Sequence, residues 1–491
     1  MKRAICLLGA IVVALLFVRV GVCGAAQEYE AKWESLDRRS TPQWWIDAKF
    51  GIFIHWGVYS VPAWSVRGEY SEWYWRRIEG DKAKNGPWWQ YHKNTYGESF
   101  AYAEFAPMFK AELYDPNQWA DIFHRSGAKY IVLTSKHHDG YCLWPSEEAN
   151  RSWGRPWNSV DIGPGRDLLG DLTKAVRAKG IHMGIYYSLY EWFNPLWVTD
   201  RAMYVEKHMF PQFKDVVTRY KPSVIFSDGE WDMHSKDWRS EELLAWLFNE
   251  SPVKDEVVID DRWGKDCRHK HGGYYTTEYG AGLESGAKPW EECRGMAHSF
   301  GYSRTEFLSD YRSARELILM LIDLVSRGGN LLLDIGPTGD GRIPVIMEER
   351  LIQMGEWLAV NGEAIYGTRN WKKTIQWTGG ERPDVGYGQE YKAKYDIAEL
   401  TGQHMGDKAV IEAFFTAKGD TLYVITPRWP GAKLVVKDVA VSSNTSVTML
   451  GLAQSIRWDR SGSDLTIHVP ALSVDEVPCR HAYVFKITHV R

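Results

Sequence analysis

One carboxylate in this sequence follows directly from an apolar, β-favouring run. Ser223–Ser227 reads Ser-Val-Ile-Phe-Ser, Asp228 comes next, and Trp231 lies three residues further on. A buried strand that ends in an acid beside an aromatic side chain can present that acid to a substrate as a nucleophile or a proton carrier. An Asp-Gly pair after a strand is also a common turn with no chemistry of its own. The other strand ends must be compared before one interpretation is preferred.

Polar side chains also follow several other short apolar runs. In chain order they are His55, Lys136-His137-His138-Asp139, Glu191, Asp228, Asp261-Arg262 and Glu278. If the runs are the parallel strands of a barrel, their carboxyl ends surround one mouth. A single strand-end histidine is more often structural, but histidines, acids and an arginine that converge by topology indicate a functional site.

A metal site is the main competing interpretation for His55, His137 and His138. His137 and His138 are adjacent, and adjacent residues of a strand point to opposite faces, so they share a metal only if the strand has already ended. The first strand also has no His-X-His pattern. Imidazole offers one donor and one acceptor, which suits neutral hydroxyl groups. We therefore expect no metal and no cofactor.

The elements that position these residues alternate between strands and helices. The strand candidates are Phe50–His55, Tyr130–Ser135, His182–Ser188, Ser223–Ser227, Glu256–Asp260, Tyr274–Thr277 and Asn330–Ile335. Their nearly continuous hydrophobicity is typical of strands covered on both faces. Helices with recognisable ends lie between them: one from Asp115-Pro116 to Gly127, one over Asp167–Lys179, and one after a Ser313–Glu316 capping box. The pattern predicts an α/β fold, a (β/α)₈-like (TIM-type) barrel. An open doubly wound sheet is the alternative, but no Gly-X-Gly-X-X-Gly follows any strand.

The chain of 491 residues is long enough for a second domain. After Gly367 the helical patterns give way to short alternating strands. Short alternating strands are predicted at Glu412–Thr416, Thr421–Thr426, Lys433–Val436, Asp464–Val469 and Tyr483–Ile487, with a turn at Lys418-Gly419-Asp420. We expect residues 27–367 to form the barrel and residues 368–491 a C-terminal antiparallel β-sandwich. Residues 368–405 have no clear pattern.

The N-terminus predicts export. Met1-Lys2-Arg3 is basic, Ala4–Val18 is almost wholly apolar, and Gly24-Ala25-Ala26 offers a cleavage site, so residues 1–26 read as a signal peptide. No other segment is predicted to span a membrane, and a net charge of −4 gives no case for nucleic acid. The destination is open: periplasm, extracellular space or, in a eukaryote, lysosome. A bridge between Cys267 and Cys293 is also left open.

Seven strings stand out in order along residues 41–367. They are WWIDAKFGIFIHWGVYSVPAW (Trp44–Trp64), SEWYW (Ser71–Trp75), SKHHDGYCLW (Ser135–Trp144), GIYYSLYEWF (Gly184–Phe193), SDGEW (Ser227–Trp231), DDRWG (Asp260–Gly264) and GGNLLLDIGPTGDG (Gly328–Gly341). Together they closely resemble the α-L-fucosidases, retaining glycoside hydrolases of family 29. The sequence departs from the family pattern at Phe226, where tryptophan is frequent, and at Asp334, where asparagine is frequent.

The resemblance implies a role for each candidate residue. Asp228 matches the nucleophile, and Glu278 matches the acid/base of one branch of the family, with Glu291 as the reserve candidate. The implied sugar contacts are His55, Glu72, Trp73, His137, His138, Tyr187 (or its neighbour Tyr186), Arg262 and Phe300.

The resemblance implies an exo-acting retaining α-L-fucosidase that releases terminal α-L-fucose from oligosaccharides or glycoconjugates by double displacement. Two alternatives remain. One is an exo-glycosidase for another L-fucose-like sugar, such as an α-L-galactoside. The other is a non-catalytic sugar-binding protein. Oligomerisation is possible, and the preferred fucosyl linkage is not predicted.

Overall fold

Eight parallel strands form one curled sheet in the N-terminal part of the computed structural model, which describes residues 28–284, 288–389 and 395–490. They are β1 (Phe50–Ile54), β2 (Tyr130–Lys136), β3 (His182–Ser188), β4 (Val224–Asp228), β5 (Val258–Ile259), β6 (Tyr275–Glu278), β7 (Trp290–Gly295) and β8 (Asn330–Ile335). Their order is β5-β4-β3-β2-β1-β8-β7-β6, and every pair is parallel. The predicted barrel-type α/β fold is therefore confirmed.

The barrel is irregular between β5 and β6, because β5 has only two residues. The backbone N–H of Tyr274 donates to the carbonyl of Ile259 at 3.2 Å. The carboxylate of Asp261 then accepts hydrogen bonds from the backbone and the hydroxyl of Thr276, at 3.1 and 2.7 Å. Side-chain hydrogen bonds thus take the place of some of the backbone hydrogen bonds that regular pairing of β5 with β6 would make, and they link the two strands.

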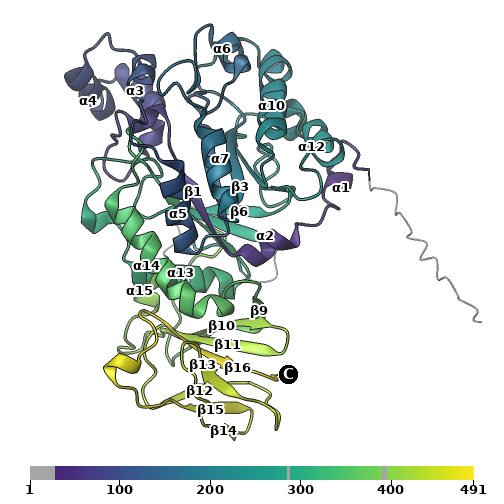
Figure 1. Ribbon diagram of the computed structural model, residues 1–491, viewed down its shortest axis with the longest axis vertical. Coiled ribbons are helices and arrows are strands. Elements are labelled where there is room, and N and C mark those ends of the chain that lie inside the picture. The colour runs from purple at the N-terminus through teal and green to yellow at the C-terminus, as the bar shows by residue number, and fades with distance from the viewer. Residues whose placement is uncertain (1–27, 285–287, 390–394, 491) are drawn as a thin grey trace, which may run out of the picture.

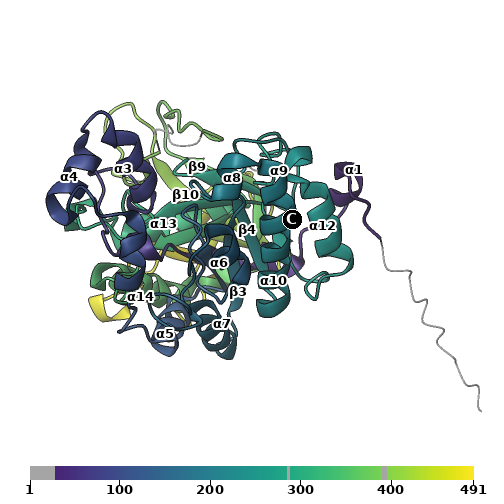
Figure 2. The ribbon, with the colours of Figure 1, turned by 90° about the horizontal axis from the view of Figure 1, so that it is seen from above.

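Helices cover the outside of the sheet, as seen from the side in Figure 1 and from above in Figure 2. The main ones are α5 (Pro116–Ser126), α7 (Leu168–Ala178), α10 (Phe210–Tyr220), α12 (Ser240–Asn249), α13 (Ala314–Ser326) and α14 (Val345–Asn361). The predicted helix ends are confirmed: Asp115 caps α5, Asp167 caps α7, and Ser313 with Glu316 forms the capping box of α13.

The strand β7 is absent from the sequence-based prediction. Its sequence, Trp-Glu-Glu-Cys-Arg-Gly, is polar, yet all six residues are buried. The carboxylates are buried with partners: Glu291 accepts a hydrogen bond from Tyr130, and Glu292 accepts one from Thr277. Hydrophobic patterning cannot reveal a strand whose polar groups are satisfied only by distant residues.

The C-terminal part holds two antiparallel sheets, which lie below the barrel in Figure 1. One has the order β13-β16-β11-β10-β9 and the other β12-β15-β14. Their bounds are β9 (Arg369–Trp377), β10 (Ile411–Lys418), β11 (Thr421–Thr426), β12 (Lys433–Val436), β13 (Val447–Met449), β14 (Trp458–Ser461), β15 (Asp464–His468) and β16 (Tyr483–Ile487). The predicted hairpin is present, with Gly419 at φ +61° in its turn. The strand β9 lies in the stretch that the sequence left unassigned.

Cys142, Cys267, Cys293 and Cys479 are all free thiols, so the possible bridge between Cys267 and Cys293 does not form. Within the described ranges no helix combines the length and the apolar character needed to cross a membrane. The expected signal peptide, residues 1–26, lies outside the described residues.

Candidate active site

A cavity opens at the carboxyl ends of the barrel strands. It is narrow: water-sized spheres find about 60 Å³ of room in it. The residues that line it are Phe53, His55, Tyr70, Glu72, Trp73, His137, His138, Tyr186, Phe226, Asp228, Trp231, Arg262, Glu278, Cys293 and Phe300. Six of the polar strand-end residues that the sequence singled out therefore meet here, as barrel topology predicts: His55, His137, His138, Asp228, Arg262 and Glu278. Lys136, Asp139, Glu191 and Asp261 were singled out as well, but they do not line the cavity.

Arg262 joins two acids across the cavity floor. Its Nη1 donates to Asp228 Oδ1 at 3.0 Å and its Nη2 to Glu278 Oε2 at 3.1 Å. Its Nε donates to the hydroxyl of Thr276 at 3.0 Å, and its guanidinium lies 4.8 Å from the ring centre of Phe226. One planar cation, fixed on a third side, therefore holds both carboxylates close together.

Asp228 is held as a carboxylate by its neighbours. Burial raises its pKa, but the charge of Arg262, the hydrogen bond to His138 and the charge of Arg268 together hold that pKa well below its usual range. The hydroxyl of Tyr186 donates a hydrogen bond to Asp228 Oδ2 at 2.9 Å. The side chain is only 10% exposed, so the anion lies at the bottom of the cavity rather than in bulk water.

Glu278 ends β6 and is 6% exposed. The hydroxyl of Tyr70 donates to its Oε1 at 3.2 Å. The backbone on both sides of Glu278 is tied to Glu292, which accepts from the Thr277 hydroxyl and, at 2.8 Å, from the Gly280 N–H. This carboxyl group is thus fixed through its own oxygens and through its backbone.

The three histidines all line the cavity. β2 ends at Lys136, so His137 and His138 follow the strand and can face the same space. His55 Nδ1 lies 2.6 Å from Asp334 Oδ1, and His138 Nδ1 lies 2.6 Å from the hydroxyl of Ser188. His137 Nδ1 is buried without a partner. Burial lowers the pKa of each ring, to about 3 for His55, so all three are neutral imidazoles near pH 7.

Glu72, Trp73 and Phe300 complete one wall. Glu72 Oε2 accepts from the backbone N–H of Gly301 at 2.8 Å and from the hydroxyl of Ser299 at 3.2 Å. Burial raises the pKa of Glu72 to about 7. The ring of Phe300 stacks on His55, with 4.7 Å between the ring centres. The wall therefore combines a carboxyl group with flat apolar faces.

The structure places two of the sequence-based candidates, Tyr187 and Glu291, outside the cavity. Tyr187 points away from the cavity and donates to Gln212 Oε1 at 2.8 Å, because neighbouring strand residues face opposite sides. Its neighbour Tyr186, the other option, lines the cavity. The reserve acid Glu291 is fully buried beside Tyr130 and is not among the lining residues.

Several lining residues were not anticipated as site residues. Cys293 was missed with its strand β7, and Tyr70 belongs to an irregular segment. Phe226 was noted only as a departure from a family pattern. Trp231 was noted in the sequence as the aromatic residue beside Asp228, but it was given no role in the site. Arg268 does not line the cavity, but its Nη2 lies 3.9 Å from Asp228 Oδ1; it comes from the loop between β5 and β6 and has no local signal.

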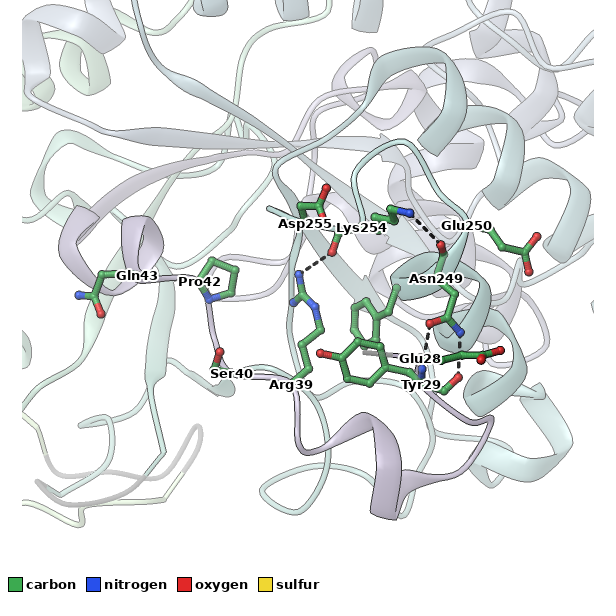
Figure 3. A pocket seen from close by; sticks show the side chains of 11 residues that line it. Glu28, Tyr29, Arg39, Ser40, Pro42, Gln43, Asn249, Glu250, Lys254 and Asp255 are labelled. Atoms are coloured by element: carbon green, nitrogen blue, oxygen red, sulfur yellow. Dashed lines mark hydrogen bonds between the residues drawn. The ribbon is translucent and has the colours of Figure 1, made fainter. Parts of the chain in front are cut away.

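A second, wider hollow does not share this chemistry. It lies between the N-terminal residues 28–43 and the end of α12 (Figure 3). There Asn249 accepts from the Tyr29 N–H at 2.9 Å and donates to the Tyr29 carbonyl at 2.8 Å, and Arg39 donates to the carbonyl of Lys254 at 3.0 Å. These contacts tie the N-terminal segment to the barrel.

Among the residues that the structure describes, no group of three or more His, Cys, Asp or Glu side chains is arranged to hold a metal ion. The three histidines of the cavity instead lie against Asp334, Ser188 and aromatic rings.

Comparisons with known proteins agree over most of the chain. A family model described as alpha-L-fucosidase matches residues 16–363, and one described as alpha-L-fucosidase C-terminal domain matches residues 406–488. Tissue alpha-L-fucosidase of Homo sapiens is 40% identical over 476 residues, which are 95% of this chain and 93% of that protein. Alpha-L-fucosidase of Branchiostoma floridae is 42% identical over 474 residues, 94% of this chain and 96% of that protein. The crystal structure of Thermotoga maritima alpha-fucosidase in complex with fucose is 34% identical with a TM-score of 0.74, and the match covers 94% of this chain and all of that one.

Proposed function

The chain belongs to the α-L-fucosidase family and is an α-L-fucosidase, and we propose that it acts as an exo-acting retaining enzyme with Asp228 as nucleophile and Glu278 as acid/base. The observation that carries this proposal is the bridge that Arg262 forms between the two carboxylates. Retaining glycosidases need two carboxyl groups about 5–5.5 Å apart, closer than inverting enzymes, which leave room for a water between them.

The reaction has two steps. In the first, Asp228 attacks the anomeric carbon while protonated Glu278 gives its proton to the glycosidic oxygen, so the bond to the aglycone breaks and a fucosyl-Asp228 ester forms. In the second, Glu278 takes a proton from water, and the water oxygen displaces Asp228 from the anomeric carbon. Two inversions return the original configuration. Arg262 supports both steps, because it keeps Asp228 ionised as an attacking and leaving group.

The rest of the cavity is suited to a neutral deoxy sugar. Neutral imidazoles of His55, His137 and His138 offer donors and acceptors for ring hydroxyls. Phe53, Phe226 and Phe300 form an apolar floor and wall, with 4.9 Å between the ring centres of Phe53 and Phe226. Such a surface favours a methyl group over a hydroxymethyl group at C5, because a buried hydroxyl there would lack a partner.

Turnover of an aryl α-L-fucoside tests the assignment. Asp228→Gly should abolish turnover, and added azide should restore part of it as a β-fucosyl azide. Glu278→Gln should lose most activity on substrates with poor leaving groups, whereas Glu291→Gln is the matched control. Undiminished activity of Asp228→Gly would reject the nucleophile. An aryl α-L-galactoside cleaved faster than the α-L-fucoside would instead identify a different sugar.

We also propose that residues 1–26 direct export and are removed before Gln27. The support is the basic start followed by an apolar segment and small residues. Mass spectrometry of the exported protein should find Gln27 as its first residue. An N-terminus that still begins at Met1 would contradict this proposal, and fractionation of the native cells would identify the compartment.

The proposed division into a catalytic unit, residues 27–367, and a C-terminal unit, residues 368–491, is supported by the change from helices to strands. α14 ends at Asn361, and the long strand β9 begins at Arg369. The chain between them holds one short turn of helix (Gly362–Ala364). Limited proteolysis should therefore leave two fragments that are divided near this connection.

A further inference from the structure

The cavity has a closed floor and an open mouth, and the mouth is aromatic. Of the lining residues, only Tyr70, Trp73 and Trp231 have appreciable solvent exposure. Trp231 is 37% exposed, against 7% for Asp228 and 6% for Glu278. A group attached to the anomeric carbon of a sugar in the cavity must therefore extend into solvent between these three rings.

The two tryptophans of the mouth come from different elements and lie side by side. Trp73 ends the short helix η2 (Ser71–Trp73), and Trp231 follows β4. Their ring centres are 5.9 Å apart with 30° between the planes. Trp231 also lies 5.8 Å from Tyr190, and Trp73 lies 5.2 Å from Trp192. Neighbouring rings thus restrict both indoles, so a ligand that contacts them loses little side-chain entropy.

Charge lies beside the mouth, on residues that do not line the cavity themselves, and this distinguishes the mouth from a surface for a lipid tail. Arg268 has a side chain 23% exposed, and its Nε donates to Glu230 Oε1 at 2.7 Å. Glu230 immediately precedes Trp231, so a polar pair adjoins the aromatic ring. Flat indole faces bind the C–H face of a pyranose, while charged groups nearby suit its hydroxyls.

We propose that Trp231 and Trp73 form the binding site for the sugar ring to which the fucose is linked, so that the enzyme prefers fucosylated glycans to fucosides of simple alcohols. This site rests on the proposed function, because its position is defined by the cavity in which Asp228 and Glu278 act. Trp231 supplies the exposed platform, and Trp73 spans the cavity and its mouth.

The experiment measures kcat/KM of the wild type and of each variant on two substrates. α-L-Fucosyl fluoride has no aglycone ring, and a fucosyl disaccharide has one. For Trp231→Ala, the ratio of kcat/KM for the disaccharide to kcat/KM for the fluoride should fall about tenfold, the worth of one aromatic contact. Trp231→Phe should restore most of the ratio, since it keeps a flat ring.

Trp429→Ala is the matched control, because Trp429 has the same 37% exposure but lies in the C-terminal part of the chain. It should leave the ratio unchanged, and thermal melting of all variants checks that they fold. An unchanged ratio in Trp231→Ala, or an equal loss on both substrates, would overturn the aglycone site while the fluoride activity of the wild type upholds the proposed function. A wild type that does not hydrolyse the fluoride would instead refute the proposed function itself.

Discussion

His55 Nδ1 and Asp334 Oδ1 lie 2.6 Å apart in a place almost closed to solvent. One proton must lie between two such atoms, so Asp334 orients the ring of His55 within the cavity. The same ring is stacked on Phe300, which leaves its other nitrogen as the free hydrogen-bonding group. Asp334 does not line the cavity itself, and it therefore acts through His55.

Removal of the Asp334 carboxyl group should weaken sugar binding. Asp334→Leu leaves His55 Nδ1 without a partner, so the KM for an aryl fucoside and the inhibition constant of L-fucose should rise about tenfold, the worth of one oriented buried hydrogen bond. Asp334→Asn keeps an acceptor oxygen at the same place and should change both constants much less. Equal behaviour of the two variants would show that Asp334 only fills space.

Replacement of Arg262 should change the pH dependence of the reaction as well as its rate. Arg262→Met removes the charge that lowers the pKa of Asp228, so the nucleophile becomes protonated at higher pH. The acidic limb of the kcat/KM profile should move to higher pH, and the maximal rate should fall about a hundredfold. Arg262→Lys keeps the charge but lacks the planar guanidinium that spans both acids, so it should lose rate with a smaller shift of the limb. If the acidic limb of the kcat/KM profile of Arg262→Met lay at the same pH as that of the wild type, the electrostatic role would be contradicted.

Loss of Glu292 should reduce acid catalysis selectively. Its carboxyl group holds Thr277 and Gly280, on either side of Glu278, and Arg294 also donates to the Gly280 carbonyl at 3.2 Å. Glu292→Ala should therefore displace Glu278 and lower kcat by ten- to a hundredfold, roughly the cost of a 1 Å misplacement, on fucosides with poor leaving groups. Fluoride or dinitrophenyl fucosides, which need little protonation, should be affected less. Glu292→Gln, which keeps one acceptor, is the control, and a uniform loss on all substrates would argue for general destabilisation.

Glu291 should affect stability rather than catalysis. Burial raises its pKa to about 8, partly offset by the hydrogen bond from Tyr130. Between the ordinary pKa of about 4.3 and this value, the unfolded chain has lost the proton that the folded chain keeps, so folding stability falls as pH rises. Between pH 5 and pH 8, the free energy of unfolding of Glu291→Gln, measured with denaturant, should rise relative to that of the wild type, by on the order of a few kcal/mol at most. A stability difference that is independent of pH would show that Glu291 is ionised in the folded protein.

The sequence by itself determined the elements whose signals are local. Strands such as Val224–Asp228 are continuous in hydrophobicity, and helices such as Pro116–Ser126 carry their caps in the adjacent residues. Because parallel strands of a barrel end at one mouth, strand-end residues such as His55, Asp228 and Glu278 could be expected to meet.

Only the tertiary structure decided which residues share a cavity and which lie behind it. Tyr186 and Tyr187 have identical side chains, and their roles differ through the face of β3 on which each one lies. Glu278 and Glu291 are both strand glutamates, yet Glu278 contacts Arg262 at the cavity floor and Glu291 lies outside the cavity beside Tyr130. The two buried carboxyl groups of β7 accept hydrogen bonds from Tyr130 and Thr277, which lie on other strands. Depth along a strand and partners across the barrel are long-range properties, so no local pattern of residues encodes them.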